Sequence, residues 1–346
     1  MATYVAAALN DPEKHFNTVI FTGDGTDDRA ITVGFQPDLV WCRQRTDDSG
    51  GYLVDVVRGN NSALRTTNTN QAGTFASMTF TSTGITVSGN ENLNNENAHN
   101  YVSWNWKAGG SAASNSSGDI TSNVSVNTTA GISIVGYTGS SDASGTTVAH
   151  GLSAVPKMMI FKEHDDNGNN FIMYHHKVGA GNYLELNDET AAASSSIMFG
   201  NTTPTSSVFT IANDSQTNGT GSGFIAYCFA EKQGFSKFGS YTGNGNANGP
   251  FVYTGFRPAF VLQKNTAVQG WQLQANEREG FNGDNDLLQP HDSAAESGVN
   301  RIDILSNGFK VITTDAGQNT DGQKYVYWAF AEAPFVNSNG VPGNAR

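Results

Sequence analysis

The chain has 346 residues, a formal net charge of −12 at pH 7 and only 14% charged residues. So few charged residues argue against coiled coils and long solvent-facing helices, which draw heavily on Glu, Lys and Arg, and the 10% aromatic residues argue against disorder. The excess of negative charge opposes binding to nucleic acid, and no apolar stretch approaches the ~20 residues that span a bilayer. We therefore expect a folded chain with no nucleic-acid partner and no membrane insertion.

At the N-terminus, residues 1–17 are expected to form an arm. Within it, Asp11 followed by Pro12 is typical of a helix start, because Pro fits the first helical turn. The apolar run that ends at Leu9 has no basic residue before it, so it lacks the layout of a secretory signal. We expect the protein to be made in a cytoplasm.

Three landmarks then recur in a constant order, which is typical of internal repeats. The first is an aromatic residue followed by Thr-Gly, and it begins at Phe21, Tyr137 and Tyr241. The second is a glycine and an apolar residue shortly before a proline and an apolar strand, with the prolines at Pro37, Pro156 and Pro258. The third is an aromatic strand, at 101–108, 224–231 and 325–332. These landmarks divide the chain into unit 1 (18–108), unit 2 (131–232) and unit 3 (239–335).

Each unit is predicted to consist of short β-strands. Side chains alternate with period two in segments such as 85–87 and 209–211, while 39 Gly and 37 Asn supply the turns. Short strands separated by turn residues are typical of an antiparallel sandwich or jelly roll. The predicted fold is all-β, with three tandem related antiparallel β-sandwich (jelly-roll-like) units. The sequence leaves open whether the units surround a pseudo-threefold axis or follow one another in a line.

The third landmark carries a face that we predict to be core. In unit 1 this face consists of Val102, Trp104 and Trp106, and the same parity in unit 3 gives Val326, Trp328 and Phe330. Residues on one face of a strand are spaced two apart, so an aromatic face that persists in two units is best explained by burial.

The connections between the units differ in length and composition. Residues 109–130 are rich in Gly, Ser and Asn and are predicted to be a flexible, exposed linker. The connection at 231–239 is too short for a free tether, so units 2 and 3 are expected to touch. Residues 336–346 are expected to form a C-terminal tail.

The sequence predicts no enzyme, no catalytic residue and no bound cofactor. Cys42 and Cys228 each lie in an apolar run, which is typical of buried thiols rather than of a disulfide or a zinc site. His175 and His176 follow an apolar strand and are expected to be a surface pair. No Gly-x-Ser-x-Gly elbow precedes a helix pattern, and the Gly-Asn-Gly stretches lack the Lys of a phosphate loop.

Calcium is the metal that the sequence favours, because closely spaced Asp and Asn supply the hard oxygen ligands it prefers. The candidate ligands lie in two loops and are Asp24, Asp27 and Asp28 in unit 1 and Asp165, Asp166 and Asn167 in unit 2. A third loop of this kind spans 282–286. None of the three has the EF-hand spacing with its Glu at position twelve, and a chain rich in Asn and Gly produces such clusters by composition alone.

A sugar contact is the second candidate site. Carbohydrate binding uses an exposed aromatic ring that stacks on a sugar face, with amides nearby to bond the hydroxyls. Trp271, in a Gly-Trp-Gln-Leu-Gln stretch, is the candidate for this contact. The alternative is that Trp271 is one more strand residue on a core face.

The landmarks also resemble a known family. The segments 239–261, 304–310 and 327–346, with the repeats of all three units, resemble repeat-bearing virion structural or tail-fibre-like proteins of marine bacteriophages. The resemblance implies a virion structural protein, most simply a tail fibre or fibre-like appendage that attaches to the host surface, with a head decoration protein or head fibre as the alternative. Its partners would be other virion proteins, copies of itself in a homo-oligomer such as a trimer, and a host-surface glycan. The family supplies no catalytic or binding residues.

Two functions of another class remain open from the sequence. A carbohydrate-binding module that works without a virion would need only a sugar site. A polysaccharide depolymerase would need two carboxylates across one cleft. The repeats offer Glu231 and Glu332 at equivalent positions, but unit 1 has Ala108 there, so the depolymerase is the weaker hypothesis.

Overall fold

The computed structural model describes residues 9, 11–142, 145–278, 282 and 286–331. The fold is nearly all-β, with 42% of residues in strands and 4% in helices, and its strands form several antiparallel sheets. This confirms the all-β prediction. Among the described residues, no helix is long and apolar enough to cross a bilayer.

Unit 1 forms two sheets after a short 3₁₀ helix, η1 (Pro12–Lys14). The larger sheet has the strand order β1 (Phe16–Thr22), β8 (Asn100–Trp106), β3 (Leu39–Gln44), β4 (Gly51–Asp55), β5 (Leu64–Arg65). The smaller sheet has the order β2 (Arg29–Thr32), β7 (Gly84–Val87), β6 (Met78–Thr81). Because β1 begins at Phe16, the end of the predicted arm 1–17 belongs to the first sheet. Residues 1–8 and 10 of that arm lie outside the described residues.

Unit 2 also forms a large and a small sheet. The large sheet has the order β16 (Ala193–Ser194), β15 (Asn182–Glu185), β14 (Ile172–His175), β13 (Met158–Glu163), β18 (Gly223–Phe229), β11 (Ile132–Thr138), β10 (Ser122–Asn127), β9 (Ala113–Asn115). The small sheet pairs β12 (Thr146–Ala149) with β17 (Val208–Ile211), and one helical turn, α1 (Ser215–Asn218), follows.

The strands β9 and β10 correct the prediction of a flexible linker at 109–130. In β10, Val124 is buried and pairs with Val135 of β11, so the strand is a full member of the sheet. The Gly, Ser and Asn residues that suggested a linker occupy the turns around these two strands, where such residues are equally favoured. Unit 2 therefore includes β9 and β10 from here on.

Unit 3 repeats the arrangement with two sheets of similar size. The first has the order β19 (Ser236–Thr242), β25 (Lys324–Ala331), β21 (Pro258–Asn265), β22 (Gln272–Ala275). The second has the order β20 (Phe251–Tyr253), β24 (Gly308–Val311), β23 (Ile302–Leu305), and one helical turn, α2 (Ala316–Asn319), precedes β25. The predicted tail 336–346 lies outside the described residues.

The three landmarks occupy the same structural positions in every unit. The first strand, the closing strand, the strand after the proline and its neighbour are adjacent in the same order, as β1-β8-β3-β4, β11-β18-β13-β14 and β19-β25-β21-β22. The glycine before each landmark proline has a positive φ, at 98° for Gly34, 71° for Gly151 and 88° for Gly255. Only glycine adopts that conformation without strain, which explains why the landmark needs it.

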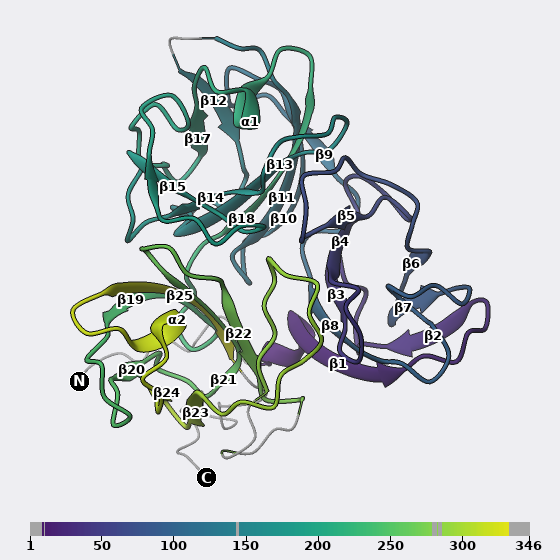
Figure 1. The fold of residues 1–346 in the computed structure, drawn as a ribbon. Coiled ribbons are helices and arrows are strands. Elements are labelled where there is room, and N and C mark those ends of the chain that lie inside the picture. The colour runs from purple at the N-terminus through teal and green to yellow at the C-terminus, as the bar shows by residue number, and fades with distance from the viewer. Residues whose placement is uncertain (1–8, 10, 143–144, 279–281, 283–285, 332–346) are drawn as a thin grey trace, which may run out of the picture.

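The closing strands of all three units meet in one aromatic core. The Trp106 ring of β8 lies 6.4 Å from the Phe229 ring of β18 and 5.6 Å from the Trp328 ring of β25, measured between centroids. Figure 1 shows the three units arranged around this centre rather than in a line. The faces predicted as core are therefore buried between units, and the arrangement that the sequence left open is decided.

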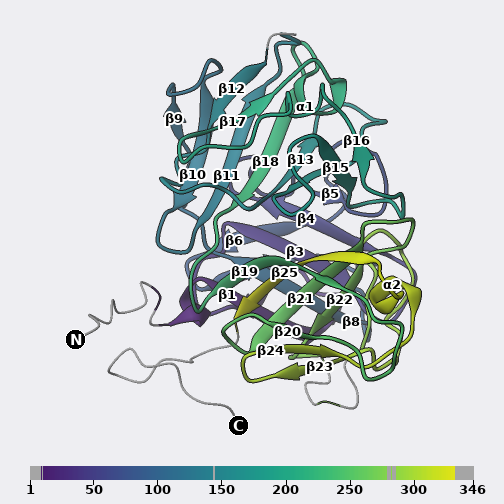
Figure 2. The same cartoon turned by 90° about the vertical axis from the view of Figure 1, so that its left-hand side faces the viewer.

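The opposite face of each larger sheet packs on the smaller sheet of its own unit. Tyr101 and Cys42 lie in the second cluster of unit 1, Phe224 and Cys228 in that of unit 2, and Tyr325 in that of unit 3. Figure 2 shows the smaller sheet of unit 3 running along the outer side of β21 and β22. Both thiols are buried and unpaired, which confirms the interpretation of the cysteines.

A buried cation reaches from each unit to a neighbouring unit. The three cations stand at the same position after their landmark prolines and are Arg43, Lys162 and Lys264. They donate to backbone carbonyl oxygens, with Lys162 Nζ 3.1 Å from Thr69, Lys264 Nζ 3.0 Å from Glu189 and Arg43 Nη1 2.7 Å from Asp292. The direction is cyclic, from unit 2 to unit 1, from unit 3 to unit 2 and from unit 1 to unit 3. The ring of contacts thus closes within a single chain.

Candidate functional site

The structure uses the carboxylate of Asp24 to build a turn. Asp24 Oδ1 accepts hydrogen bonds from Thr26 N at 2.9 Å and from Thr26 Oγ1 at 2.8 Å. The backbone N–H of Thr26 is the main reason why the pKa of Asp24 is lowered. Arg29 also contacts the carboxylate, at 3.4 Å. The oxygens that were candidate calcium ligands therefore already have protein partners.

The loop that holds Asp24 recurs in the other two units without a carboxylate. A buried Asn accepts the backbone N–H that follows the Thr-Gly landmark in each unit, at Asn95 for Asp24, Asn218 for Ser140 and Asn319 for Asn244. The same turn therefore forms around Asp, Ser or Asn. Such a pattern indicates a structural turn rather than a metal site.

The remaining calcium candidates do not converge. Asp27 is exposed, and Asp28, at a φ of 53°, accepts a hydrogen bond from Ser88 Oγ at 3.1 Å. In unit 2, Asp165 Oδ2 accepts the Gly223 N–H at 2.7 Å. Its neighbours are engaged as well, with Asp166 Oδ1 accepting from Asn167 N at 2.7 Å and Asn167 Oδ1 from Gln71 N at 2.9 Å. Part of the third loop, 283–285, lies outside the described residues.

The described residues contain one cluster of ligating side chains that the sequence reasoning missed. Asp47, Glu96 and His99 each bring an atom within 4.8 Å of the others. His99 Nε2 lies 2.7 Å from Asp47 Oδ2, and the Asp47 side chain is 52% exposed. The geometry is that of an exposed ion pair between two loops of unit 1.

Trp271 is buried, which corrects its interpretation as a sugar contact. Its relative exposure is 2%, and it lies in the aromatic core shared by the units. Trp271 Nε1 donates to the Glu185 carbonyl oxygen of unit 2 at 2.7 Å. The indole N–H is hydrogen-bonded and the ring is buried, so Trp271 contributes to the contact between unit 3 and unit 2. A sugar cannot stack on a ring that is not exposed.

The histidine pair also differs from the prediction of a surface pair. His175 is 3% exposed, and its Nε2 lies 3.3 Å from the Tyr327 carbonyl oxygen of unit 3. His176 Nε2 lies 2.8 Å from the Phe238 carbonyl oxygen. These contacts confirm that units 2 and 3 touch. Glu231 forms an ion pair with Lys237 at 2.8 Å, while Glu332 lies outside the described residues.

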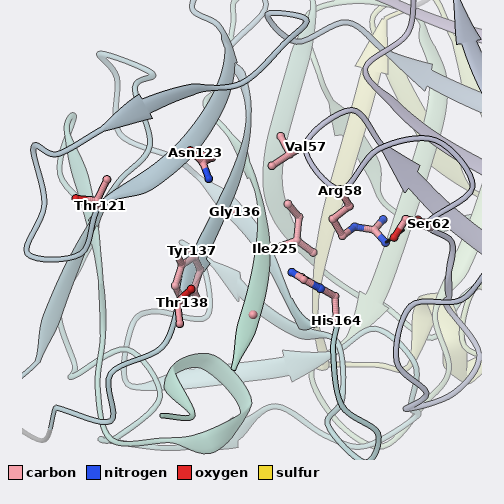
Figure 3. A pocket seen from close by; sticks show the side chains of 11 residues that line it. Val57, Arg58, Ser62, Thr121, Asn123, Gly136, Tyr137, Thr138, His164 and Ile225 are labelled. Atoms are coloured by element: carbon pink, nitrogen blue, oxygen red, sulfur yellow. Dashed lines mark hydrogen bonds between the residues drawn. The ribbon is translucent and has the colours of Figure 1, made fainter. Parts of the chain in front are cut away.

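The best-formed cavity lies between unit 1 and unit 2 and has a volume of about 410 Å³. The turn after β4 supplies one wall through Val57 and Arg58. The strands β10, β11 and β18 supply the other wall through residues that include Asn123, Gly136 and Ile225. Figure 3 shows the Asn123 amide and the His164 imidazole pointing toward the same space, with Val57 and Ile225 beside it.

A buried ionic triad holds the two walls together. The Arg58 side chain is 3% exposed and the Asp55 side chain 0%, and Arg58 Nε lies 2.6 Å from Asp55 Oδ2. Tyr227 of β18 donates its hydroxyl to Asp55 Oδ2 at 2.8 Å and accepts from Arg58 Nη2 at 3.2 Å. In the closing strand, Tyr227 stands where units 1 and 3 have Trp104 and Trp328. A tyrosine at this position provides the hydroxyl that joins unit 2 to unit 1.

Two glycines keep the cavity open. A Cβ atom at Gly136 would lie 3.0 Å from Val57 Cγ1, and one at Gly223 would lie 2.8 Å from His164 Cε1. Both positions are therefore too crowded for a larger residue unless a wall moves. The equivalent of Gly136 is Ile20 in unit 1 and Ser240 in unit 3, so the cavity is particular to this pair of units.

The remaining polar lining groups are open to a ligand. Among the described residues, the side chains of Thr121, Asn123 and Thr138 have no protein hydrogen-bond partner; all three line the cavity at its solvent-exposed side. Burial, and after it the positive charge of Arg58, lowers the pKa of His164, so its imidazole is neutral at neutral pH. The site thus combines neutral donors and acceptors with a small apolar surface. Sequence reasoning missed it because its walls come from two units and from the supposed linker.

A second, more open hollow has a different character. It measures about 400 Å³ and lies where all three units meet, with Thr67 of unit 1, Asp188 and Glu189 of unit 2 and Asp292 of unit 3 among its lining residues. His291 Nε2 lies 3.1 Å from Glu189 Oε1 within it. Its lining is acidic, whereas that of the first cavity is neutral.

Comparison with known proteins gives one match. Residues 11–334 match a protein family described as "Domain of unknown function (DUF7483)". No curated protein and no solved structure matches the chain. The family match covers all three units and the aromatic core between them.

Proposed function

The chain belongs to the DUF7483 family, and we propose that it is a structural protein of a bacteriophage virion, a tail fibre or fibre-like appendage that contacts the host surface. The observation that carries the proposal is the threefold repeat, in which three turn-rich β units share one aromatic core and resemble virion proteins in their landmarks. The protein would be made in the host cytoplasm and reside in the virion.

We infer further that each unit is one β-sandwich of jelly-roll type, with boundaries near 16–108, 113–232 and 236–331. Each unit has a large and a small sheet with a hydrophobic cluster that draws on both. Two stacked sheets around one core are the defining feature of a sandwich. The cyclic contacts through Arg43, Lys162 and Lys264 support a pseudo-threefold relation between the three proposed sandwiches.

The proposed partners are other virion proteins and further copies of the chain. Virion appendages are commonly symmetric homo-oligomers, and a chain with internal pseudo-threefold character would fit a threefold position. A trimer measured by analytical ultracentrifugation would support this part of the proposal, and a monomer at all concentrations would contradict it.

The test of the virion assignment is the composition of the particle. Particles of a phage that encodes the chain are purified, and their proteins are identified by mass spectrometry. We expect the chain among the structural proteins and, by cryo-electron microscopy with a specific antibody fragment, at the tail. Location at the head would instead favour a decoration protein or head fibre. Absence from purified particles would overturn the proposal.

The cavity between units 1 and 2 favours one candidate of another class, a carbohydrate-binding module that acts without a virion. Its polar lining has the size and neutrality that such a site needs. Sugar binding by the free protein combined with absence from particles would select this function. A depolymerase has less support, because no carboxylate lines this cavity, and in the second, acidic hollow Glu189 is already paired with His291.

A further inference from the structure

We propose that the cavity between unit 1 and unit 2 binds a neutral polyhydroxylated ligand, the pyranose ring of a saccharide. The neutrality and hydroxyl character follow from the lining residues. The choice of a saccharide over a free acyclic polyol rests on the proposed function, contact with a host surface.

The single cation at the cavity is not free to bind an anion. Each side-chain nitrogen of Arg58 donates to a protein acceptor, Nε to Asp55 at 2.6 Å, Nη1 to the Ser62 carbonyl oxygen at 2.7 Å and Nη2 to the Leu53 carbonyl oxygen at 3.1 Å. The Asp55 carboxylate also neutralises its charge. A phosphate or carboxylate ligand would have to break this triad, and breaking a buried ion pair is strongly unfavourable.

The cavity is equally unsuited to a cation. Asp55 Oδ1 accepts the backbone N–H groups of Val57 at 3.0 Å and Arg58 at 2.9 Å, while Oδ2 accepts Arg58 and Tyr227. Asp55 lies behind the lining, and no Asp or Glu is among the lining residues. A hard cation such as calcium is bound by several oxygen ligands that include carboxylates, and no free carboxylate lines this cavity.

The remaining polar groups of the lining are suited to hydrogen-bond the hydroxyls of a sugar. The amide of Asn123 supplies both a donor and an acceptor, and the hydroxyls of Thr121 and Thr138 supply more, none of them satisfied within the described protein. Val57, with the bare backbone at Gly136, forms a small apolar surface against which the C–H face of a pyranose can pack, while Ile225 is fully buried beneath the cavity wall. This mixture of a few placed polar groups and an apolar wall is typical of small-ligand sites.

The affinity is expected to be weak, because the cavity offers no aromatic platform. Tyr137 is the aromatic residue of the lining, but it is 5% exposed and its hydroxyl donates to the Thr217 carbonyl oxygen at 2.7 Å. Without ring stacking, a single site should bind a monosaccharide with a Kd of about 1 mM. Repeated copies on one particle would raise the effective affinity by multivalency.

Saturation-transfer NMR and ligand titrations measure saccharide binding to the full chain. The probes are the methyl glycosides of glucose, galactose, mannose, rhamnose and N-acetylglucosamine, with sorbitol as the acyclic arm. We expect saturable binding of at least one glycoside and none of sorbitol. The variants Asn123→Ala and Thr138→Val should each weaken binding by about 10-fold, the effect of one lost hydrogen bond. The control Asn307→Ala removes an exposed amide of unit 3 and should leave binding unchanged.

The outcomes separate this inference from the proposed function. Binding of no glycoside, binding of sorbitol alone, or binding that Asn123→Ala and Thr138→Val leave unchanged would each overturn the saccharide site, whatever the particle contains. Glycoside binding that both variants weaken would support it, even if mass spectrometry finds no copy of the chain in virions. Circular dichroism of the two variants shows whether a loss of binding reflects a loss of fold.

Discussion

The Tyr227 hydroxyl donates a hydrogen bond to the Asp55 carboxylate at 2.8 Å, and both side chains are fully or almost fully buried. The two residues belong to different units, and Arg58 completes the triad between them. This contact couples the closing strand of unit 2 to the turn after β4 in unit 1. It also fixes the wall of the cavity that we propose as a saccharide site.

Substitution of Tyr227 and substitution of Asp55 should lower the free energy of unfolding by unequal amounts. Tyr227→Phe deletes the two hydrogen bonds of the hydroxyl but leaves the Asp55–Arg58 pair, so the free energy of unfolding should fall by about 2 kcal/mol. Asp55→Ala leaves the buried Arg58 charge without a counter-ion and should cost about 3 to 5 kcal/mol. Urea denaturation measures both. The control is Tyr253→Phe, at a side chain that is 64% exposed, and its stability should not change. Equal losses in both variants would contradict the triad.

The ring of cations should stabilise the contacts between units. Lys264→Met removes the donor to the Glu189, Ala267 and Gln269 carbonyl oxygens, of which that of Glu189 keeps the N–H of Gln269 as its partner. We expect a loss of about 1 to 3 kcal/mol in urea denaturation. Hydrogen exchange should accelerate at Gln269, whose N–H bonds the Glu189 carbonyl oxygen. Lys14→Met, at a side chain that is 73% exposed, is the control. An unchanged exchange rate at Gln269 would argue against this role.

The free energy of unfolding should decrease in mild acid because the buried His175 resists protonation in the folded state. Burial, followed by the charges of His176 and Lys324, lowers the pKa of His175 to about 3. The unfolded chain takes up this proton near pH 6.5 and the native chain does not, so the stabilisation is present above pH 6.5 and is lost as the pH falls from there toward 3. From about pH 7.5 to about pH 5 the expected loss is about 2 kcal/mol.

A variant isolates that contribution. His175→Gln cannot titrate, so the decline of unfolding free energy between neutral pH and pH 5 should become shallower, although His150 and His291, whose pKa values are also lowered by burial, still contribute. His99→Gln is the control, because His99 is a partly buried ion-pair partner whose pKa is raised, so its removal cannot make the decline shallower. The same steep decline in His175→Gln and in the native protein would refute the assignment.

The shared core should make the three units unfold together. Trp106 packs on rings from units 2 and 3, including Phe229 and Trp328. Trp106→Ala should cost about 3 to 5 kcal/mol, the usual effect of removing a buried large aromatic side chain. Calorimetry of the native chain should show one transition. Ile20→Ala, at a 45% exposed position, is the control. Three separate transitions would mean that the units are stable on their own.

Calcium should have no effect on stability. The Asp24 carboxylate is engaged by Thr26 and Arg29, and the equivalent turn of unit 2 forms around Ser140. We therefore expect the same melting temperature with millimolar calcium and with a chelator. Asp24→Ser, which copies unit 2, should remain folded. A calcium-dependent rise in melting temperature that Asp24→Ser abolishes would restore the metal site.

The repeat and the all-β fold could be predicted from the sequence because they depend on local information. A glycine with positive φ before Pro37, Pro156 or Pro258 and alternating side chains in the closing strands are properties of short segments. The burial of Trp104 and Trp106 followed from the same alternation. The linker at 109–130 was mispredicted because Gly, Ser and Asn are favoured in tight turns as much as in free chains.

Tertiary structure alone decided which surfaces of the units meet. Whether Trp271 is exposed depends on unit 2 lying against it, and whether His175 is a surface residue depends on Tyr327, 152 positions away. The cavity is likewise formed by the turn at Arg58 and by strands of another unit, and no local pattern marks it. Alternation shows that a face is buried but not which partner buries it, because hydrophobic burial has no direction. The closure of three units around one core, and the site between two of them, therefore became visible only in three dimensions.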